Sequence, residues 1–265
     1  MKKKKKHLTI GIFGFGNMGQ AIFKSLKASK DFKSSGFYIH SINTIRVKGA
    51  KCAASLLALI QKSDVIFLCI KPQDFKTLAA IKLKEKNKIF ISIMAGIKTA
   101  EISRTTGSKK VIRTMPNLAL RVGESMTGWH AGKKNFTSSE LRLVNQLLNA
   151  FGQEIFLNDE KKIDALSAVS GCGPAYVFLF MDALIQAAVK LGFKKDEAKI
   201  LVRQSVAGSL LYSQEEENLP LLIKRVTSKK GITEAALKSL GTDHFYKNWE
   251  KALKKAYERA GELSK

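Results

Sequence analysis

The residues most able to do chemistry form the segment GFGNMG, from Gly14 to Gly19. It follows the apolar run TIGIF and opens a segment with helical spacing, which is the setting in which a glycine-rich turn binds a dinucleotide. Gly14 would permit the tight turn, Gly16 would let the backbone approach a pyrophosphate, and Gly19 would let the helix pack closely on the strand. A plain turn between strand and helix is the alternative.

The end of the second apolar run carries no acidic residue. In NAD-binding domains an Asp or Glu there binds the ribose hydroxyls. Between Asp31 and Asp64 this chain has none, and it offers hydroxyl, amide and guanidinium groups, which bind a ribose 2′-phosphate that a carboxylate would repel. The sequence therefore predicts NADPH, with NADH possible, although Arg46 alone could equally be a solvated loop residue. The groups are Ser41, Asn43, Thr44 and Arg46.

Further candidates follow the later apolar runs, because ligands of open α/β sheets bind beyond the carboxyl ends of the strands. Lys71 and Pro72, in KPQD, are expected to face the nicotinamide half of the cofactor. Asn117, in RTMPNLAL, is expected near the reacting centre, whereas Arg113 is an equally good structural ion-pair partner. The predicted cofactor-binding residues are Gly14, Phe15, Gly16, Asn17, Met18, Gly19, Ser41, Asn43, Arg46, Lys71, Pro72, Ala95 and Gly96.

The elements that must position these residues follow from the apolar patterning. Five runs, HLTIGIF, GFYIHSI, DVIFLCI, KIFISIM and KVIRTM, alternate with helical stretches. Each is nearly continuous in apolar residues, which favours strands covered on both faces, as in a parallel sheet. From about Asp159 the chain reads as helices. We predict a doubly wound α/β Rossmann-like domain over residues 1–158 and an all-α domain over residues 159–265.

The helical half has two features with a possible function. The segment PAYVFLFMDALIQAAVKLG is apolar around its circumference, so a bundle core or a subunit interface must cover it, and the interface is at least as strongly expected. In VTSKKGITEAALKSL, the hydroxyls of Thr227, Ser228 and Thr233 could cap a helix. The free N–H groups of that helix could instead bind a carboxylate.

Composition and charge indicate which partners and which cellular location to expect. The 265 residues carry a formal net charge of +24, which favours anionic partners. The lysines are spread along the chain without interleaved aromatics, so no specific nucleic acid is expected, and the run Lys2–Lys6 is interpreted as a solvated tail. No signal peptide is predicted, and no uncharged segment approaches the roughly 18 apolar residues of a spanning helix. Three widely separated cysteines indicate neither disulfides nor a metal site, which favours a cytoplasmic location.

The ordered motifs GFGNMG, CIKPQD, ISIMAGI, RTMPN, SGCGPAYVFLFMDAL and VTSKKGITEAAL resemble the pyrroline-5-carboxylate reductase family over the length of the chain. The resemblance implies reduction of 1-pyrroline-5-carboxylate to L-proline with NADPH, in a homodimer or higher homo-oligomer. It implies an active site between one subunit's cofactor domain and helices of its partner. It also assigns SGCGPAY to the substrate pocket, and the substrate carboxylate to Ser228, Gly231, Ile232 and Thr233.

The expected catalytic residues are Thr233, which could face the ring nitrogen, with Lys71 and Asn117. The substrate imine can take its proton from solvent, so no strong general acid is required. None of the four histidines falls in a segment placed at the pocket, and no metal is expected.

Four positions depart from the family pattern. Lys229 and Lys230 replace the Pro-Gly pair of TSPGGTT, so either the loop differs or the added cations help to attract the anion. Gly19 stands where the family commonly has Ala, and Cys172, where it has Ser, is interpreted as a packing residue.

Two alternatives remain from the sequence. The β-hydroxyacid dehydrogenases share the glycine turn, but their second domain has a catalytic Lys followed four residues later by Asn. Here Lys190 is followed by Lys194. A non-catalytic basic protein that binds NADP or RNA is supported only by the altered TSKKGIT loop.

Overall fold

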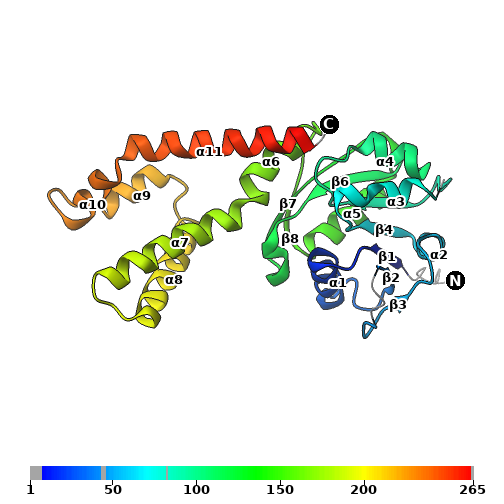
Figure 1. The fold of residues 1–265 in the computed structure, drawn as a ribbon, viewed down its shortest axis with the longest axis horizontal. Coiled ribbons are helices and arrows are strands. Elements are labelled where there is room, and N and C mark those ends of the chain that lie inside the picture. Colours follow the sequence, from blue (N-terminus) through cyan, green and yellow to red (C-terminus); the bar gives the residue numbers. More distant parts are fainter. Residues whose placement is uncertain (1–7, 43–45, 82, 264–265) are drawn as a thin grey trace. The chain divides into compact units, whose positions relative to one another are not determined.

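One sheet of eight strands organises the first part of the chain in the computed structural model, which describes residues 8–42, 46–81 and 83–263 (Figure 1). Its order is β3-β2-β1-β4-β5-β6-β7-β8, and its first six strands have the order of a dinucleotide-binding domain. All pairs are parallel except β6 with β7. The strands are β1 Thr9–Phe13, β2 Gly36–His40, β3 Lys51–Cys52, β4 Val65–Leu68, β5 Ile89–Ser92, β6 Val111–Met115, β7 Ser125–Ala131 and β8 Gly152–Phe156.

The five apolar runs all form strands, so the predicted α/β class is confirmed. The sequence did not indicate β3, β7 or β8. In β7 the polar residues Ser125 and Thr127 are buried, and their hydroxyls lie 3.2 Å apart within hydrogen-bonding distance. In β8 half-buried and exposed residues alternate, so neither strand has a continuous apolar run.

Helices cover both faces of the sheet. On one face α1 (Asn17–Ala28) and α5 (Ser138–Asn149) share a core with β1, β2 and β4. On the other face α2 (Leu56–Lys62), α3 (Phe75–Ala79) and α4 (Thr99–Thr106) form a second core. Apolar residues on one stripe of each helix account for this packing, as Ile22 and Leu26 of α1, both fully buried, illustrate.

Short helical turns connect these elements. The 3₁₀ turns are η1 (Pro72–Asp74), η2 (Leu118–Val122) and η3 (Lys133–Asn135). After β8 the chain forms α6 (Lys162–Leu166) and a π-helical turn, η4 (Ser167–Gly171). By packing, the chain through Cys172, with the end from Ala256, forms one unit, and Gly173–Lys255 forms the other. Thus α6 and η4, which follow residue 158, belong with the sheet.

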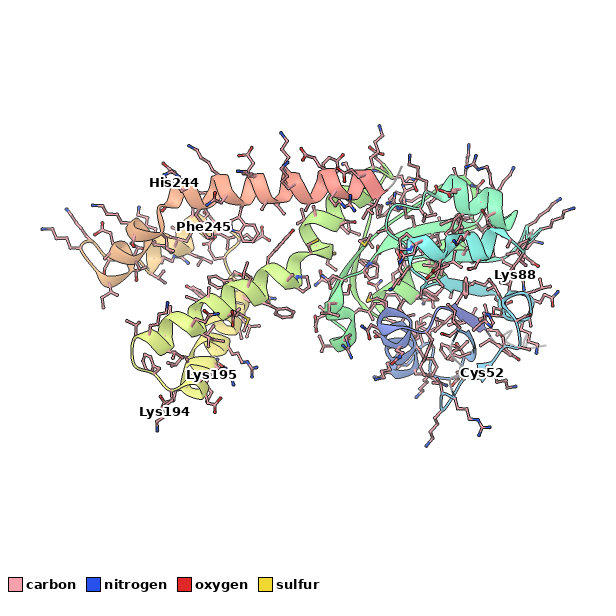
Figure 2. All side chains as sticks on the ribbon, viewed as in Figure 1. Cys52, Lys88, Lys194, Lys195, His244 and Phe245 are labelled. Atoms are coloured by element: carbon pink, nitrogen blue, oxygen red, sulfur yellow. The ribbon has the colours of Figure 1, made fainter. Side chains whose placement is uncertain are left out.

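The second unit is built of helices and buries little. They are α7 (Gly173–Lys190), α8 (Lys195–Tyr212), α9 (Leu219–Arg225), α10 (Ile232–Leu240) and α11 (Thr242–Leu263), whose last residues belong to the first unit. Among its described residues only Ala198 and Val202 are buried. Most apolar side chains of this unit are therefore left exposed. Figure 2 shows Lys194 and Lys195 at the turn between α7 and α8.

The helical run Lys162–Lys190 is long and apolar enough to cross a membrane, by length and composition alone. The run contains charged residues, among them Asp164 and Asp182, so it is not an uncharged segment of the kind sought in the sequence. The same length and composition occur in helices that are covered by protein, so this property does not by itself indicate a membrane.

Candidate active site

The glycine turn joins β1 to α1, and it is closely packed at Gly14 and Gly19 but open at Gly16. Gly14 has φ +89°, and a Cβ placed on it would lie 2.7 Å from the carbonyl carbon of Cys69. A Cβ on Gly19 would lie 2.2 Å from the main-chain oxygen of Gly14, so the first turn of α1 lies directly against the turn. A Cβ on Gly16 would meet no atom within 4 Å. Gly16 is also the N-cap of α1 and makes no side-chain cap hydrogen bond.

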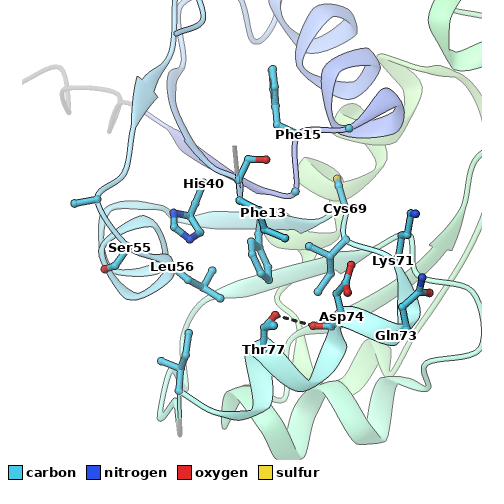
Figure 3. A pocket seen from close by; sticks show the side chains of 17 residues that line it. Phe13, Phe15, His40, Ser55, Leu56, Cys69, Lys71, Gln73, Asp74 and Thr77 are labelled. Atoms are coloured by element: carbon cyan, nitrogen blue, oxygen red, sulfur yellow. Dashed lines mark hydrogen bonds between the residues drawn. The ribbon is translucent and has the colours of Figure 1, made fainter. Parts of the chain in front are cut away.

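A cavity of about 800 Å³ opens at this turn, where the carboxyl ends of β1 and β4 meet (Figure 3). This is the position at which open α/β sheets bind their ligands. Its walls combine apolar groups with a polar rim. The lining residues are Phe13, Gly14, Phe15, Gly16, His40, Ser41, Ile42, Ala54, Ser55, Leu56, Cys69, Ile70, Lys71, Gln73, Asp74, Thr77 and Ile81.

The β2 side of the cavity carries His40, Ser41 and Ser55 and no carboxylate. His40 was not among the predicted cofactor-binding residues: it ends β2, stacks on Phe13 with ring centroids 6.0 Å apart, and places Nδ1 3.3 Å from the Ala53 oxygen. Its position depends on the pairing of β1 with β2, which spacing along the chain does not reveal. Ser55 caps α2 by accepting a hydrogen bond from Ala58 N–H at 3.1 Å.

The β4 side of the cavity carries Lys71, Gln73, Asp74 and Thr77 (Figure 3). Thr77 donates from Oγ1 to the main-chain oxygen of Asp74 at 2.6 Å, which stabilises the turn after KPQD. Burial raises the pKa of the Cys69 thiol, so this group stays protonated and acts as part of the wall. Gln73, Asp74 and Thr77 were not predicted, although the first two belong to the KPQD segment and Thr77 lies three residues after it.

The structure brings some of the predicted residues to the cavity and leaves others away from its lining. Gly14, Phe15, Gly16, Ser41 and Lys71 line it. The rest of the turn, Asn17 to Gly19, begins α1, and Pro72 begins η1. Arg46 is exposed, and Ala95 and Gly96 follow β5. Asn43, Thr44 and the run Lys2–Lys6 lie outside the described residues.

Arg113, in β6, and Asn117, just after it, both bond to groups of the protein. Arg113 is 1% exposed, and its Nη2 donates to Asp164 Oδ1 at 2.6 Å, so the ion-pair alternative describes it. Asn117 is the N-cap of η2, where its side chain accepts from Ala119 N–H. No group of metal-binding side chains occurs in the part of the chain that the structure describes.

The second unit holds the predicted substrate loop between α9 and α10. Gly231 is the N-cap of α10 and makes no side-chain cap hydrogen bond. The prediction that a hydroxyl from this loop caps the helix is therefore wrong: Thr227 donates instead to the oxygen of Ile223 at 2.6 Å. Ser228 lies over Gly231, where a Cβ would be 2.1 Å from its Oγ. Thr233 is the second residue of α10, after Ile232.

Comparisons with known proteins match both halves of the chain. Residues 9–96 match a family described as NADP oxidoreductase coenzyme F420-dependent, and residues 160–263 match pyrroline-5-carboxylate reductase dimerisation. The pyrroline-5-carboxylate reductase of Staphylococcus saprophyticus is 33% identical over 95% of this chain and 96% of its own length. That of Pseudomonas aeruginosa is 36% identical over 77% of this chain and 76% of its own length.

Solved structures give the same result. The Plasmodium falciparum pyrroline carboxylate reductase, with NADP bound, has a TM-score of 0.89 at 28% identity and covers 99% of this chain and 100% of its own. The Coxiella burnetii pyrroline-5-carboxylate reductase has a TM-score of 0.86 at 30% identity and covers 97% of this chain and 98% of its own.

The sheet order, the glycine turn and the cavity beside it define a Rossmann-type dinucleotide-binding protein with a helical second part. The motifs of both parts and the relatives matched over nearly the whole length identify the group within that class. The chain belongs to the pyrroline-5-carboxylate reductase family.

Proposed function

We propose that the protein reduces 1-pyrroline-5-carboxylate to L-proline with NADPH, the last step of proline biosynthesis. The observation that carries the proposal is the cavity at the open face of Gly16, in a chain that matches reductases over both parts. The chain lacks the Lys and Asn pair of the β-hydroxyacid dehydrogenases, with Lys194 in place of the Asn.

The cavity residues fit a dinucleotide. NADPH, when bound, supplies a hydride from C4 of its nicotinamide. The N–H groups at the start of α1 bind the pyrophosphate, which can approach closely because Gly16 has no side chain. In NAD-binding domains a carboxylate at the end of β2 would repel a 2′-phosphate. This chain has His40 and Ser41 there, which supports NADPH over NADH. Lys71 adds a cation at the other end of the cavity.

The substrate loop orients the second reactant. The N–H groups of Ile232 and Thr233, with the hydroxyls of Ser228 and Thr233, hold the substrate carboxylate at the start of α10. A new C–H bond forms at the imine carbon, and the electron pair of the C=N bond moves to the nitrogen, which already holds a proton from solvent. Holding the carboxylate presents one face of the ring to the hydride.

The assembly is part of the proposal. Residues 1–158 carry the cofactor domain and residues 159–265 the substrate and dimerisation domain of a cytoplasmic homodimer or higher homo-oligomer, with α6 and η4 of the latter range packed on the sheet. The match of residues 160–263 to a dimerisation family supports this division, and so do the exposed apolar side chains of α7, among them Phe178 at 57% and Leu179 at 71%.

The test is the loss of NADPH absorbance when purified protein is mixed with pyrroline-5-carboxylate, with NADH in parallel. We expect turnover that favours NADPH and falls on the order of 100-fold in Thr233→Ala, because a carboxylate-binding group and its orientation are lost together. Thr242→Ala, an exposed threonine of the same unit outside the loop, is the matched control and keeps wild-type turnover. NADPH binding without turnover of this substrate would overturn the proposal.

A further inference from the structure

The side-chain amide of Asn117 is engaged at both ends by the protein. Oδ1 accepts from Ala119 N–H at 3.0 Å. Nδ2 donates to the main-chain oxygen of Ser170 at 3.1 Å and to its Oγ at 3.3 Å. Ser170 Oγ in turn donates to the main-chain oxygen of Met126 at 3.2 Å. One amide therefore joins the end of β6, strand β7 and the turn η4, all within the first unit.

The turn that Asn117 holds has an uncommon geometry. Cys172 N–H donates to the oxygen of Ser167 at 2.9 Å, five residues back, which makes η4 a π-helical turn. Such turns are rare and occur often at functional sites. Here the turn is the last structure of the first unit before the chain enters α7 at Gly173.

The helix before this turn is fixed to the sheet independently. Arg113 holds the middle of this helix through Asp164 at 2.6 Å, and Glu160 Oε1, just before the helix, lies 3.8 Å from Nη1. Its last residue, Leu166, packs so closely on β7 that a Cβ on Gly128 would lie 2.5 Å from Leu166 Cδ1. Because α6 has these anchors of its own, the two hydrogen bonds from Asn117 Nδ2 to Ser170 act on η4, whereas its Oδ1 caps η2.

We propose that Asn117 is a positioning residue, which acts through Ser170 to hold η4 and so fixes the start of the segment SGCGPAY. The role rests on the reductase function proposed above, which places this segment in the substrate pocket. Asn117 then contributes to the reaction without touching the substrate. A polar side chain that follows a strand end of a Rossmann-type sheet would otherwise be assigned to the reacting centre.

The experiment combines kinetics with hydrogen exchange in the ligand-free protein, for Asn117→Ala and Ser170→Ala. We expect kcat/KM for pyrroline-5-carboxylate to fall roughly tenfold in Asn117→Ala, because the hydrogen bonds to Ser170 are lost, while the Kd for NADPH stays within about twofold. Amide exchange of residues 170–172 should rise roughly tenfold. Ser170→Ala, which keeps the main-chain acceptor, should change both in the same direction but less.

Asn149→Ala, an exposed asparagine at the end of α5, is the control and should change neither quantity. A fall in kcat/KM with unchanged exchange would mean that Asn117 contacts the substrate, which overturns the proposal. Faster exchange with unchanged kinetics, or no change in either, also overturns it. If the wild-type protein fails to reduce the substrate, the reductase function is refuted and the positioning role is refuted with it. The wild-type assay alone distinguishes this result from a failure of the positioning role.

Discussion

Gly14 and Gly16 are both glycine, for different physical reasons. Gly14 has a positive φ and faces the backbone of Cys69 and Ile70, so a side chain there strains the folded protein itself. Gly16 has φ −74° and open space where a side chain would go, so a side chain there meets only the ligand.

We therefore expect the two alanine variants to separate stability from cofactor binding. Gly16→Ala should keep the free energy of unfolding within about 0.5 kcal/mol of wild type and weaken NADPH binding by roughly tenfold or more. Gly14→Ala should lower the free energy of unfolding by at least about 1–2 kcal/mol. Denaturant unfolding and a fluorescence titration with NADPH measure the two effects. Equal loss of stability in both variants would contradict this assignment.

These residues also show how far the sequence could predict the site. The glycine turn and Lys71 were found because their signals are local: spacing within a few residues and position after an apolar run. His40 and the partners of Asn117 could not be found that way. His40 reaches the cavity through the register of β1 with β2, and Asn117 binds Ser170, which lies 53 residues further along the chain. Contacts of that separation depend on the tertiary fold.

The loop before α10 contains a residue in a conformation that favours glycine. Lys230 has φ +57°, and its N–H donates to Glu234 Oε2, a contact that holds the loop against the start of the helix. The family pattern has glycine at this position, so the loop keeps a left-handed residue there with lysine in place of glycine. A left-handed conformation costs a residue with a side chain roughly 1–2 kcal/mol.

Lys230→Gly should accordingly raise the free energy of unfolding by about 0.5–1 kcal/mol, the relief of strain less the greater entropy that glycine gives the unfolded chain. Lys229→Gly is the matched control: Lys229 does not have a positive φ, so only the entropy term applies, and the free energy of unfolding should fall by about 0.4–1 kcal/mol. Urea unfolding midpoints compare the two variants. If both shift the midpoint in the same direction, the strain at Lys230 is not the cause.

Among the elements, those with continuous apolar runs were predictable and those without were not. The strands β1, β2, β4, β5 and β6 each carry such a run. Strand β7 buries the hydroxyls of Ser125 and Thr127 by pairing them with each other, and Ser125 Oγ also accepts from Asn117 N–H at 3.0 Å. A polar residue can be buried without a large energetic cost only when it has a hydrogen-bond partner, and the periodicity of a sequence does not show which residue that partner is.

At the scale of the whole molecule, the exposed apolar side chains of the second unit indicate that another surface covers them. Val177, Phe178, Leu179 and Phe180 of α7 are between 46% and 71% exposed. Covering one such side chain is worth about 1.5–3 kcal/mol, so several in each copy can stabilise a dimer. We expect light scattering to give at least twice the mass of one chain. Leu179→Lys should shift the protein toward monomer, whereas Val122→Lys, 76% exposed in the first unit, should not.

The same measurement decides between the two environments that could cover α7. Its length and composition also suit a membrane. If a membrane covers α7, Leu179→Lys should not change the mass of the protein in buffer, and the wild-type protein should co-sediment with lipid vesicles. A second copy of the helical domain predicts the opposite: a mass that halves in the variant and no sedimentation with vesicles. Because the proposed substrate pocket takes helices from the partner subunit, the dimer further predicts that Leu179→Lys loses turnover at concentrations where it is monomeric. NADPH binding in the first unit should persist, since the cavity at Gly16 is formed by residues of that unit alone.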